Sequence, residues 1–547
     1  MRLFSLLRIP FLLVLGAGVF TSTDQSLHLN FPCDSPTHED FPALMAFYEA
    51  SNGAGWTNNS GWGEDCDVCV WYGVDCLDGR VSRLSLPNNG LNGTIANEIG
   101  NLTFLRNLRL DNNALQGFIP SSIGSLSNLQ DLNLSRNQLE GVLPDQLGSL
   151  TKLEFIRLSY NNFQGSLPDI FSSLVNLEFL FLSSNDFSGP IPQSIFSLNN
   201  LTRLYVDGTN ISGGLSESIG NLLSLQHLQL SSTNLGGSIP SNIGLLQELT
   251  TLNLSDAKLV GEIPSTLYDA VSLNSLNLSK NQLSGSIEED IHQLSQLTNL
   301  SISENLLNGN LPSSIGQLSS LITLSLSRNE FSGEIPISLG DLESLRTLDL
   351  SYNDFNGPIP TSLGQLRSLS TLRLSRLPNL NGFIPESIYN LANLRSISLT
   401  GSNLSGPITS GIGNLVNLTS LQIGENQFTG NFPSEIGDLP LLNNANLSNN
   451  LFTGCIPASY QRFCGNPNFT VVRNCSLENP DFDEFCAGDQ CDDRLAFQIS
   501  SSEACEGDAL SIEVVTAFNY DFVWSEEGIE SSVLNTIATT SKFYTVT

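Results

Sequence analysis

Residues 105–126 read LRNLRLDNNALQGFIPSSIGSL, and this stretch of sequence decides the fold. Leu108 and Leu110 stand at alternate positions, so a short strand here sends both side chains to one face and Arg109 to the other. Asn113 follows where the chain turns, and an amide side chain satisfies both kinds of backbone group that a buried turn leaves unpaired. The glycine and proline that come next permit and then fix a second turn. The stretch therefore predicts one coil that cannot bury its own leucines.

The same pattern recurs in sixteen copies between Val81 and Pro457, with a period of 24 residues and one slip to 25. Stacked coils bury one another's leucines in a continuous core, which is how such an array becomes stable. The period predicts an α/β repeat solenoid. Its concave side should carry a parallel β-sheet, and its convex side should be 3₁₀ or irregular.

The consensus LxxLxLxxNxLxGxIPxxLGxL resembles the leucine-rich repeats of the plant-type subclass, in which an LxGxIP half follows the common LxxLxLxxN half. The resemblance covers about 70% of the chain. The Asn column is kept at Asn89, Asn113, Asn137, Asn161, Asn185, Asn281, Asn305, Asn329, Asn353, Asn426 and Asn450. It fails at Thr209, Thr233, Ala257 and Ser402. Because Thr and Ser still make one hydrogen bond, we expect only Ala257 to lose the interaction.

The N-terminal residues predict export. Arg2 and Arg8 precede an apolar run from Ile9 to Phe20. This run has about twelve residues, whereas a membrane-spanning helix needs ~20. Residues 1–22 therefore read as a secretory signal peptide. No later segment has the length of a transmembrane helix, so we expect a secreted or cell-surface protein without direct membrane insertion.

A solenoid needs caps at its exposed ends, and residues 23–80 are predicted to form the first one. They contain an amphipathic helix from about Phe41 to Glu49, followed by CVWYGVDC. That string resembles the N-terminal cap of plant-type leucine-rich repeat proteins, and the resemblance implies a disulfide between Cys69 and Cys76. Four cysteines allow three pairings, and we favour Cys33 with Cys66 for the other bridge.

Two other readings of these cysteines are disfavoured. A redox-active C-x-x-C pair lacks a surrounding βαβ pattern, and a zinc site lacks a nearby histidine to complete the ligand set. We therefore predict no metal and no cofactor.

The solenoid is predicted to span residues 81–465, and residues 466–494 to form a C-terminal cap and an acidic linker. Cys455, Cys464 and Cys475 should close the last repeat, although three further cysteines leave the pairing open. The acidic segment 478–493 lacks the ligand spacing of an EF-hand loop, which favours a solvated linker over a calcium site. Residues 495–547 alternate like strands and resemble part of an Ig-like or PKD-like module of Bacteroidetes surface adhesins.

Charge and motif content exclude several functions. The net charge is −32, and a surface this acidic repels phosphate backbones, so no nucleic-acid partner is expected. The four histidines are scattered, and no nucleophile–base spacing, phosphate loop or metalloprotease motif is present. We therefore predict a protein that is not an enzyme and has no catalytic residues.

The outward strand positions of the concave sheet are free to bind a ligand. In the second to seventh repeats they carry arginines and aromatic residues, types that are enriched at binding hot spots. The candidate ligand-binding residues are Arg109, Phe155, Arg157, Tyr160, Phe179, Phe181, Arg203, Tyr205 and His227, with Arg136 beside them. The alternative is that the phenylalanines only stack along the ladder and cover one another. From the eighth repeat onward the positions are mostly Ser, Thr and Asn, and the 25-residue slip is expected to present Arg376 locally.

Three function classes follow. The favoured class is a recognition or adhesion protein, monomeric or surface-tethered, whose solenoid binds a protein or glycan ligand. The second is a receptor ectodomain-like or enzyme-inhibitor module in defence or signalling. The third is ice binding by the row Thr323, Thr347 and Thr371.

Overall fold

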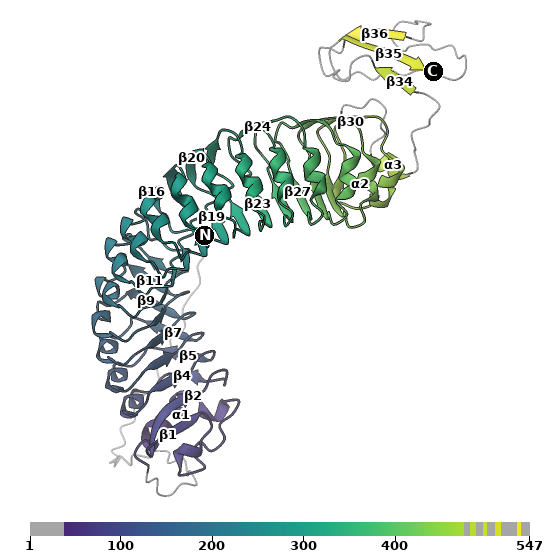
Figure 1. The fold of residues 1–547 in the computed structure, drawn as a ribbon. Coiled ribbons are helices and arrows are strands. Elements are labelled where there is room, and N and C mark those ends of the chain that lie inside the picture. Colours follow the sequence, from purple (N-terminus) through teal and green to yellow (C-terminus); the bar gives the residue numbers. More distant parts are fainter. Residues whose placement is uncertain (1–37, 475–481, 488–495, 500–508, 516–532, 538–547) are drawn as a thin grey trace, which may run out of the picture.

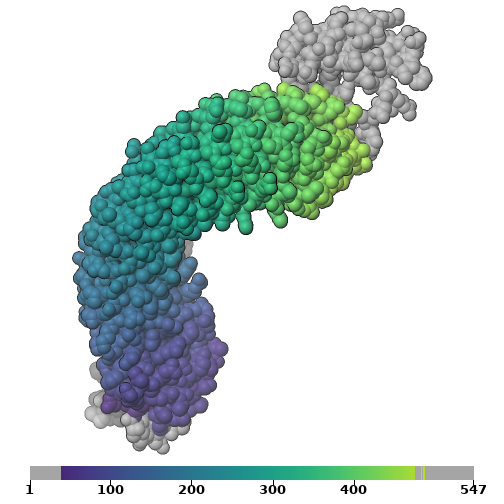
Figure 2. Space-filling model, viewed as in Figure 1, coloured from purple at the N-terminus to yellow at the C-terminus, as the bar shows by residue number. Residues whose placement is uncertain are grey.

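The computed structural model describes residues 38–474, 482–487, 496–499, 509–515 and 533–537. Residues 38–474 wind into a curved solenoid of stacked coils (Figure 1). Figure 2 shows these coils as one continuous curved body in which the colours succeed one another in sequence order. Each coil thus packs on its neighbours in the chain, as the repeat predicts. The predicted signal peptide, residues 1–22, lies outside the described residues.

The concave side is one sheet of 18 strands. It starts with β1 (Val74–Leu77), which is antiparallel to β2 (Arg80–Ser85), and every later neighbour is parallel. The parallel strands that follow are β4 (Asn107–Arg109), β6 (Asp131–Asn133), β8 (Phe155–Arg157), β10 (Phe179–Phe181), β12 (Arg203–Tyr205), β14 (His227–Gln229), β15 (Thr251–Asn253), β17 (Ser275–Asn277), β19 (Asn299–Ser301), β21 (Thr323–Ser325), β23 (Thr347–Asp349), β25 (Thr371–Arg373), β27 (Ser396–Ser398), β29 (Ser420–Gln422), β31 (Asn444–Asn446) and β33 (Phe469–Thr470). The sheet therefore continues a few residues past position 465, where we placed the end of the solenoid.

The convex side is built from short 3₁₀ helices, one per coil, which confirms the predicted solenoid class. They are η3 (Asn97–Asn101), η4 (Ser121–Ser125), η5 (Asp145–Ser149), η6 (Phe171–Ser173), η7 (Gln193–Ser197), η8 (Glu217–Asn221), η9 (Ser241–Leu245), η10 (Ser265–Asp269), η11 (Glu289–Gln293), η12 (Ser313–Gln317), η13 (Ile337–Asp341), η14 (Thr361–Gln365), η15 (Glu386–Asn390) and η16 (Ser410–Asn414), with the α-helix α2 (Ser434–Asp438) and η17 (Ala458–Phe463) at the end.

Four lateral sheets connect the concave strands to this side. The first is β3 (Asn92–Gly93), β5 (Ala114–Gly117), β7 (Gln138–Gly141), β9 (Asn162–Ser166), β11 (Asp186–Gly189) and β13 (Asn210–Ile211); the second is β16 (Val260–Glu262), β18 (Gln282–Gly285), β20 (Leu306–Asn310) and β22 (Glu330–Ser332); the third is β24 (Asn356–Pro358) and β26 (Asn379–Asn381); the fourth is β28 (Ser405–Pro407), β30 (Gln427–Asn431) and β32 (Leu451–Thr453).

The buried Asn ladder ties each coil to the one before it. The side-chain amide of Asn353 donates to the carbonyl of Leu350 in its own coil at 2.9 Å and to that of Leu326 in the preceding coil at 3.0 Å. Its Oδ1 accepts from the backbone N–H of Phe331 at 3.1 Å. The prediction that one amide satisfies both donors and acceptors is confirmed, and each Asn therefore adds a bond between coils.

The ladder is weakest in the three coils that follow β12. Thr209 Oγ1 donates to Val206 at 2.7 Å and Thr233 Oγ1 to Leu230 at 2.8 Å, so each bond stays within its own coil. Ala257 offers no side-chain bond, as expected. The first lateral sheet also ends here at β13, as the second ends at β22 and the third at β26. Ser402 differs from these three, since its Oγ donates across to the carbonyl of Leu374 in the preceding coil.

The N-terminal cap contains the predicted helix, which runs as α1 (Phe41–Ala50). Asp40 is buried at the start of α1, where it accepts from Arg80 Nη2 at 2.6 Å and from the backbone N–H of Val81 at 2.8 Å. These bonds fix the helix to β2. Short 3₁₀ turns, η1 (Gly53–Gly55) and η2 (Val68–Val70), complete the cap.

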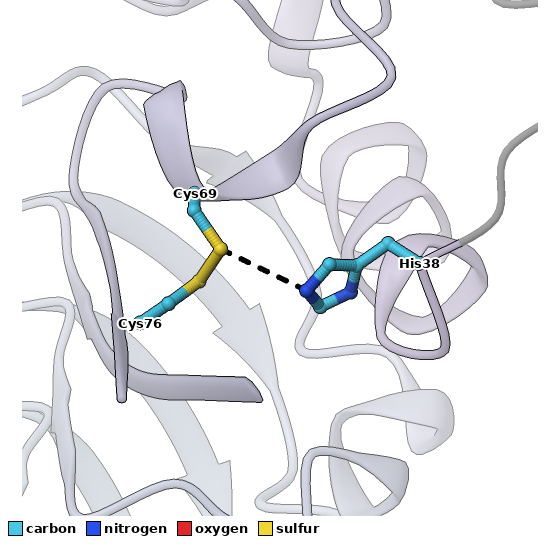
Figure 3. Close-up of side chains that lie close together, drawn as sticks. All are labelled: His38, Cys69 and Cys76. Atoms are coloured by element: carbon cyan, nitrogen blue, oxygen red, sulfur yellow. Dashed lines mark hydrogen bonds between the residues drawn. A yellow bond between two sulfur atoms is a disulfide. The ribbon is translucent and has the colours of Figure 1, made fainter. Parts of the chain in front are cut away.

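The disulfide between Cys69 and Cys76 is confirmed. Figure 3 shows the His38 ring beside it, with Nε2 3.7 Å from Cys69 Sγ. The prediction that no histidine lies near these cysteines is therefore wrong. Both thiols are consumed by the disulfide, however, so the three residues do not form a thiolate metal site. Cys66 is also disulfide-bonded, but Cys33 lies outside the described residues and their pairing stays a prediction.

The C-terminal cap closes the core with aromatic rings. Phe463 and Phe469 stack with centroids 4.1 Å apart, and Phe482 of α3 (Phe482–Ala487) lies 5.3 Å from Phe469. A disulfide joins Cys464 to Cys486, which settles one of the pairings that the sequence left open. Part of the acidic segment 478–493 is therefore helical and belongs to the cap.

Beyond the cap, β34 (Ala496–Ile499), β35 (Ala509–Val515) and β36 (Val533–Ile537) form an antiparallel sheet. The rest of residues 495–547 lies outside the described part of the chain, so the Ig-like or PKD-like module stays a prediction. Among the residues that are described, no helix is long and apolar enough to cross a membrane.

Candidate functional site

Six of the predicted ligand-binding residues form one patch on the concave sheet. Strands β8, β10 and β12 pair in register, so the outward side chains form two columns across the sheet. We call these six residues the aromatic–arginine patch: Phe155, Phe179 and Arg203 in one column and Arg157, Phe181 and Tyr205 in the other.

The rings of the patch stack on one another. Phe181 and Tyr205 are nearly parallel, with centroids 4.6 Å apart, and Phe179 and Phe181 are parallel at 5.6 Å. Phe155 is tilted against Phe179 at 4.9 Å. The stacking that we considered as the alternative to binding is therefore real, yet all four side chains remain partly exposed. A stacked, partly exposed aromatic surface keeps apolar area for a ligand to cover.

One buried carboxylate binds two arginines at the edge of the patch. Asp131 on β6 is buried, with its side chain only 2% exposed, and its carboxylate accepts from Arg109 Nη2 at 2.5 Å and from Arg157 Nη1 at 2.6 Å, which offsets one of their two charges. Arg157 also lies over the Phe155 ring at 4.9 Å. Asp131 was not among the residues predicted from the sequence. The available signal was an acidic residue at an outward strand position with an arginine in the coil on each side.

Arg203 is the arginine of the patch that keeps donor capacity. Its guanidinium lies over the Phe179 ring at 4.8 Å, and its buried Nε has no hydrogen-bond partner among the described residues. His227 pairs with Arg203 in register on β14. Burial lowers the pKa of His227, and the positive charge of Arg203 lowers it further. Burial also raises the pKa of Tyr205, so its phenol stays protonated and able to donate at neutral pH.

Two predicted residues lie outside the strands. Tyr160 and Arg136 occupy left-handed turn positions, at φ 60° and 54°, rather than outward strand positions. Arg136 stacks over the Tyr160 ring at 4.4 Å, so the two residues pair with each other at the edge of the concave face. The strand assignment of Tyr160 was therefore wrong, because the strand β8 ends at Arg157.

The insertion does present Arg376, which lies in a left-handed turn and is exposed. It is not a free charge, however. Its Nη1 donates to Glu425 Oε2 at 2.6 Å and its Nη2 to Oε1 at 3.2 Å, across the coil in between. The row of Thr323, Thr347 and Thr371 pairs in register but is only three residues long.

Comparisons with known proteins agree with this architecture. The family model described as leucine-rich repeat region matches residues 80–207 and 305–446, and the model described as leucine rich repeat matches residues 200–222, 224–246 and 272–294. The receptor-like protein kinase BRI1-like 3 of Arabidopsis thaliana is 45% identical over 74 residues, which are 13% of this chain and 6% of that protein. The chain therefore spans only a small part of this relative's length.

Two solved structures match most of the solenoid. The plant peptide hormone receptor RGFR1, in complex with RGF2, is 30% identical, with 72% of this chain and 74% of that chain covered and a TM-score of 0.56. A leucine-rich repeat protein of Leptospira interrogans is 31% identical, with 71% and 94% covered and a TM-score of 0.57. On these matches and on the repeat geometry, the chain belongs to the leucine-rich repeat proteins.

Proposed function

We propose that this protein is an extracellular recognition module, similar in role to a receptor ectodomain, that binds a peptide through the aromatic–arginine patch. The observation that carries the proposal is the clustering itself: stacked, partly exposed rings beside Arg203, whose guanidinium lies over Phe179 and has no carboxylate partner among the described residues. Such rings supply apolar contact area at low entropic cost, and they recur at hot spots of protein recognition.

The chemistry of the patch indicates which part of a peptide it binds. Because Asp131 accepts hydrogen bonds from both Arg109 and Arg157 and offsets one of their two positive charges, these arginines have fewer donors left for a carboxylate. The rings and the Arg203 donor instead suit an apolar or aromatic side chain next to a backbone carbonyl. The likeness to a receptor solved with a peptide hormone supports a peptide as the ligand.

This function is preferred over surface adhesion, which the sequence analysis favoured. The adhesion hypothesis depended on the C-terminal module, most of which lies outside the described residues. A location outside the cell is supported by the disulfides Cys69–Cys76 and Cys464–Cys486, since such bonds persist in oxidising compartments. Three threonines in register make a row too short to support ice binding as an alternative.

The test begins by selecting binders from a random twelve-residue peptide library on the full chain. The affinity of the selected peptides is then measured for wild type and for a Phe179→Ala, Phe181→Ala, Arg203→Ala triple variant. We expect the variant to bind at least about 100-fold more weakly, because hot-spot truncations each cost about 2 kcal/mol or more.

A matched control removes three outward residues elsewhere on the same sheet, namely Ser275→Ala, Asn277→Ala and Asn299→Ala. This variant should bind like wild type, and both variants should keep the circular dichroism of the folded solenoid. Unchanged affinity in the patch variant would end the proposal, as would an equal loss in the control.

A further inference from the structure

We propose that the C-terminal half of the concave face holds a second binding site, a polar hollow that takes a carboxylate group. This site goes beyond the proposed function, because it uses no residue of the aromatic–arginine patch. The hollow has a volume of about 400 Å³. It is lined by Ser327, Arg328, Asp349, Ser351, Tyr352, Arg373, Ser375, Arg376, Ser398, Thr400 and Gln422.

The register of the coils explains how these residues meet. Asp349, Arg373, Ser398 and Gln422 occupy the same outward position on β23, β25, β27 and β29, so they form the floor. The left-handed residue of each turn stands at the rim, and there the chain places Arg328, Tyr352 and Arg376. Serine and threonine hydroxyls fill the positions between floor and rim. Small side chains between larger ones leave the space that the hollow occupies.

Arg373 has only a distant acidic partner. Its side chain is 46% exposed, and its Nη1 lies 4.0 Å from Asp349 Oδ2, at the outer limit of an ion pair. At the edge of the aromatic–arginine patch, by contrast, Asp131 holds Arg109 and Arg157 at hydrogen-bond distance. The guanidinium of Arg373 therefore retains most of its donors for a ligand, and its planar fork matches the two oxygens of a carboxylate.

The two arginines at the rim are held by neighbours. Arg376 reaches over Gly401 to Glu425, and a Cβ added at Gly401 would lie 2.9 Å from the Arg376 Nη1 atom. Arg328 lies over the Tyr352 ring at 4.2 Å. Glu425 offsets the charge of Arg376, so Arg328 and Arg373 supply the positive field of the hollow.

The hydroxyl groups give the floor further hydrogen-bonding capacity. Ser375 Oγ and Ser398 Oγ lie 2.7 Å apart, and Ser375 Oγ also accepts from the backbone N–H of Thr400 at 3.1 Å. Hydroxyl hydrogens rotate to suit a neighbour, so these groups can turn a donor towards a bound oxygen.

The charge of the hollow contrasts with that of the whole chain. Three arginines and a single aspartate line it, whereas the chain carries a net charge of −32. The overall field repels anions, so binding of an acidic probe must come from a local arrangement of cations. The bound carboxylate has two possible sources in a peptide, an acidic side chain or a free chain end.

The experiment uses the full chain and three short probes in isothermal titration calorimetry at low salt. N-acetyl-tetraglutamate amide has only side-chain carboxylates, N-acetyl-tetraglutamine with a free end has only a terminal one, and N-acetyl-tetraglutamine amide has none. We expect one or both carboxylate probes to bind at least about tenfold more tightly than the uncharged amide, as charge-assisted hydrogen bonds require. Which probe binds identifies the source of the carboxylate.

Variants locate the binding. Arg373→Gln should remove the preference for carboxylate, whereas Arg367→Gln, an exposed arginine just after η14 and outside the hollow, should keep it. The patch variant of the previous section should also keep it, so the two proposals fail independently. The site is refuted if no probe binds, if the uncharged amide binds equally well, or if folded Arg373→Gln retains the preference.

Discussion

The aromatic–arginine patch and the polar hollow occupy equivalent positions on one sheet, yet their arginines are in different states. At the edge of the patch, Asp131 is buried and holds Arg157 of the patch and the neighbouring Arg109 at 2.6 and 2.5 Å. In the hollow, Asp349 is more exposed and lies 4.0 Å from Arg373. The backbone beneath is the same repeated strand. The depth and reach of one carboxylate therefore decide whether an arginine supports stacked rings or remains able to bind an anion.

The largest effect is expected from the Asn ladder, which should stabilise the coils of the patch and of the hollow equally. Asn161→Ala lies under the patch and Asn353→Ala near the hollow, and each removes hydrogen bonds to buried backbone groups in two coils. Unpaired buried groups cost about 1–3 kcal/mol each, so either variant should lose about 3 kcal/mol of unfolding free energy. Urea denaturation followed by circular dichroism measures the loss. The exposed Asn299→Ala serves as control, and clearly unequal losses at the two ladder positions would contradict a common scaffold.

A second change should convert one region towards the other. Asp131→Asn removes the negative charge that Arg109 and Arg157 share. We expect the free energy of unfolding to fall by about 2 kcal/mol, because both arginines can partly reach water. The same variant should gain binding of N-acetyl-tetraglutamate amide at the patch. Calorimetry on the Asp131→Asn, Arg373→Gln double variant measures this new site alone, because Arg373→Gln removes binding in the hollow. If the double variant binds no acidic peptide, the buried carboxylate is not what separates the two regions.

A smaller effect is expected from salt, which should weaken binding in the hollow more than binding at the patch. Raising sodium chloride from 0.05 to 0.5 M shortens the screening length, so carboxylate binding in the hollow should weaken about threefold or more. The affinity of peptides selected on the patch should change by less than about twofold, because salt does not screen apolar contacts. Titrations of both ligand types at the two salt concentrations make the comparison, and equal weakening would mean that the patch also binds through charge.

The smallest effect is a pH response from His227, which lies beside the patch on β14. Burial lowers the pKa of His227 in the folded protein, so at mildly acid pH the unfolded chain binds more protons than the folded one. The contribution of His227 to the free energy of unfolding is therefore complete above the ordinary histidine pKa of ~6.5, and it is lost as the pH falls below that value. Melting temperatures between pH 7.5 and 5 should therefore decline less steeply in His227→Gln than in wild type. His292→Gln, an exposed histidine of η11, should follow wild type, and identical slopes for all three proteins would contradict the assignment.

The repeat period predicted the fold well, because the spacing of leucines dictates both the strand and the buried face. The Asn column followed from the same local pattern, whereas the Cys69–Cys76 disulfide was implied by the resemblance of the cap to that of plant-type leucine-rich repeat proteins. What the sequence could not indicate were contacts between coils at outward positions. Asp131 binds Arg109 and Arg157 only because neighbouring strands align in register, and Arg376 meets Glu425 by skipping a coil.

The site was predicted less completely for the same reason. Six residues of the patch were recognised by type, since aromatic residues at outward strand positions stand out in a polar array. The hollow was not, because serines and threonines resemble ordinary filling until curvature and register gather arginines around them. His38 beside the Cys69–Cys76 disulfide is a further example, because it lies 31 residues before Cys69 and no local pattern connects them.

The weak stretch of the Asn ladder lies between the two binding regions. Around Thr209, Thr233 and Ala257, fewer hydrogen bonds join one coil to the next, and the first lateral sheet ends. We expect any bending of the arc to be easiest where side-chain bonds between coils are fewest. Such bending would change the separation between the patch and the hollow and leave each surface intact, so a ligand long enough to touch both would also set the curvature of the protein.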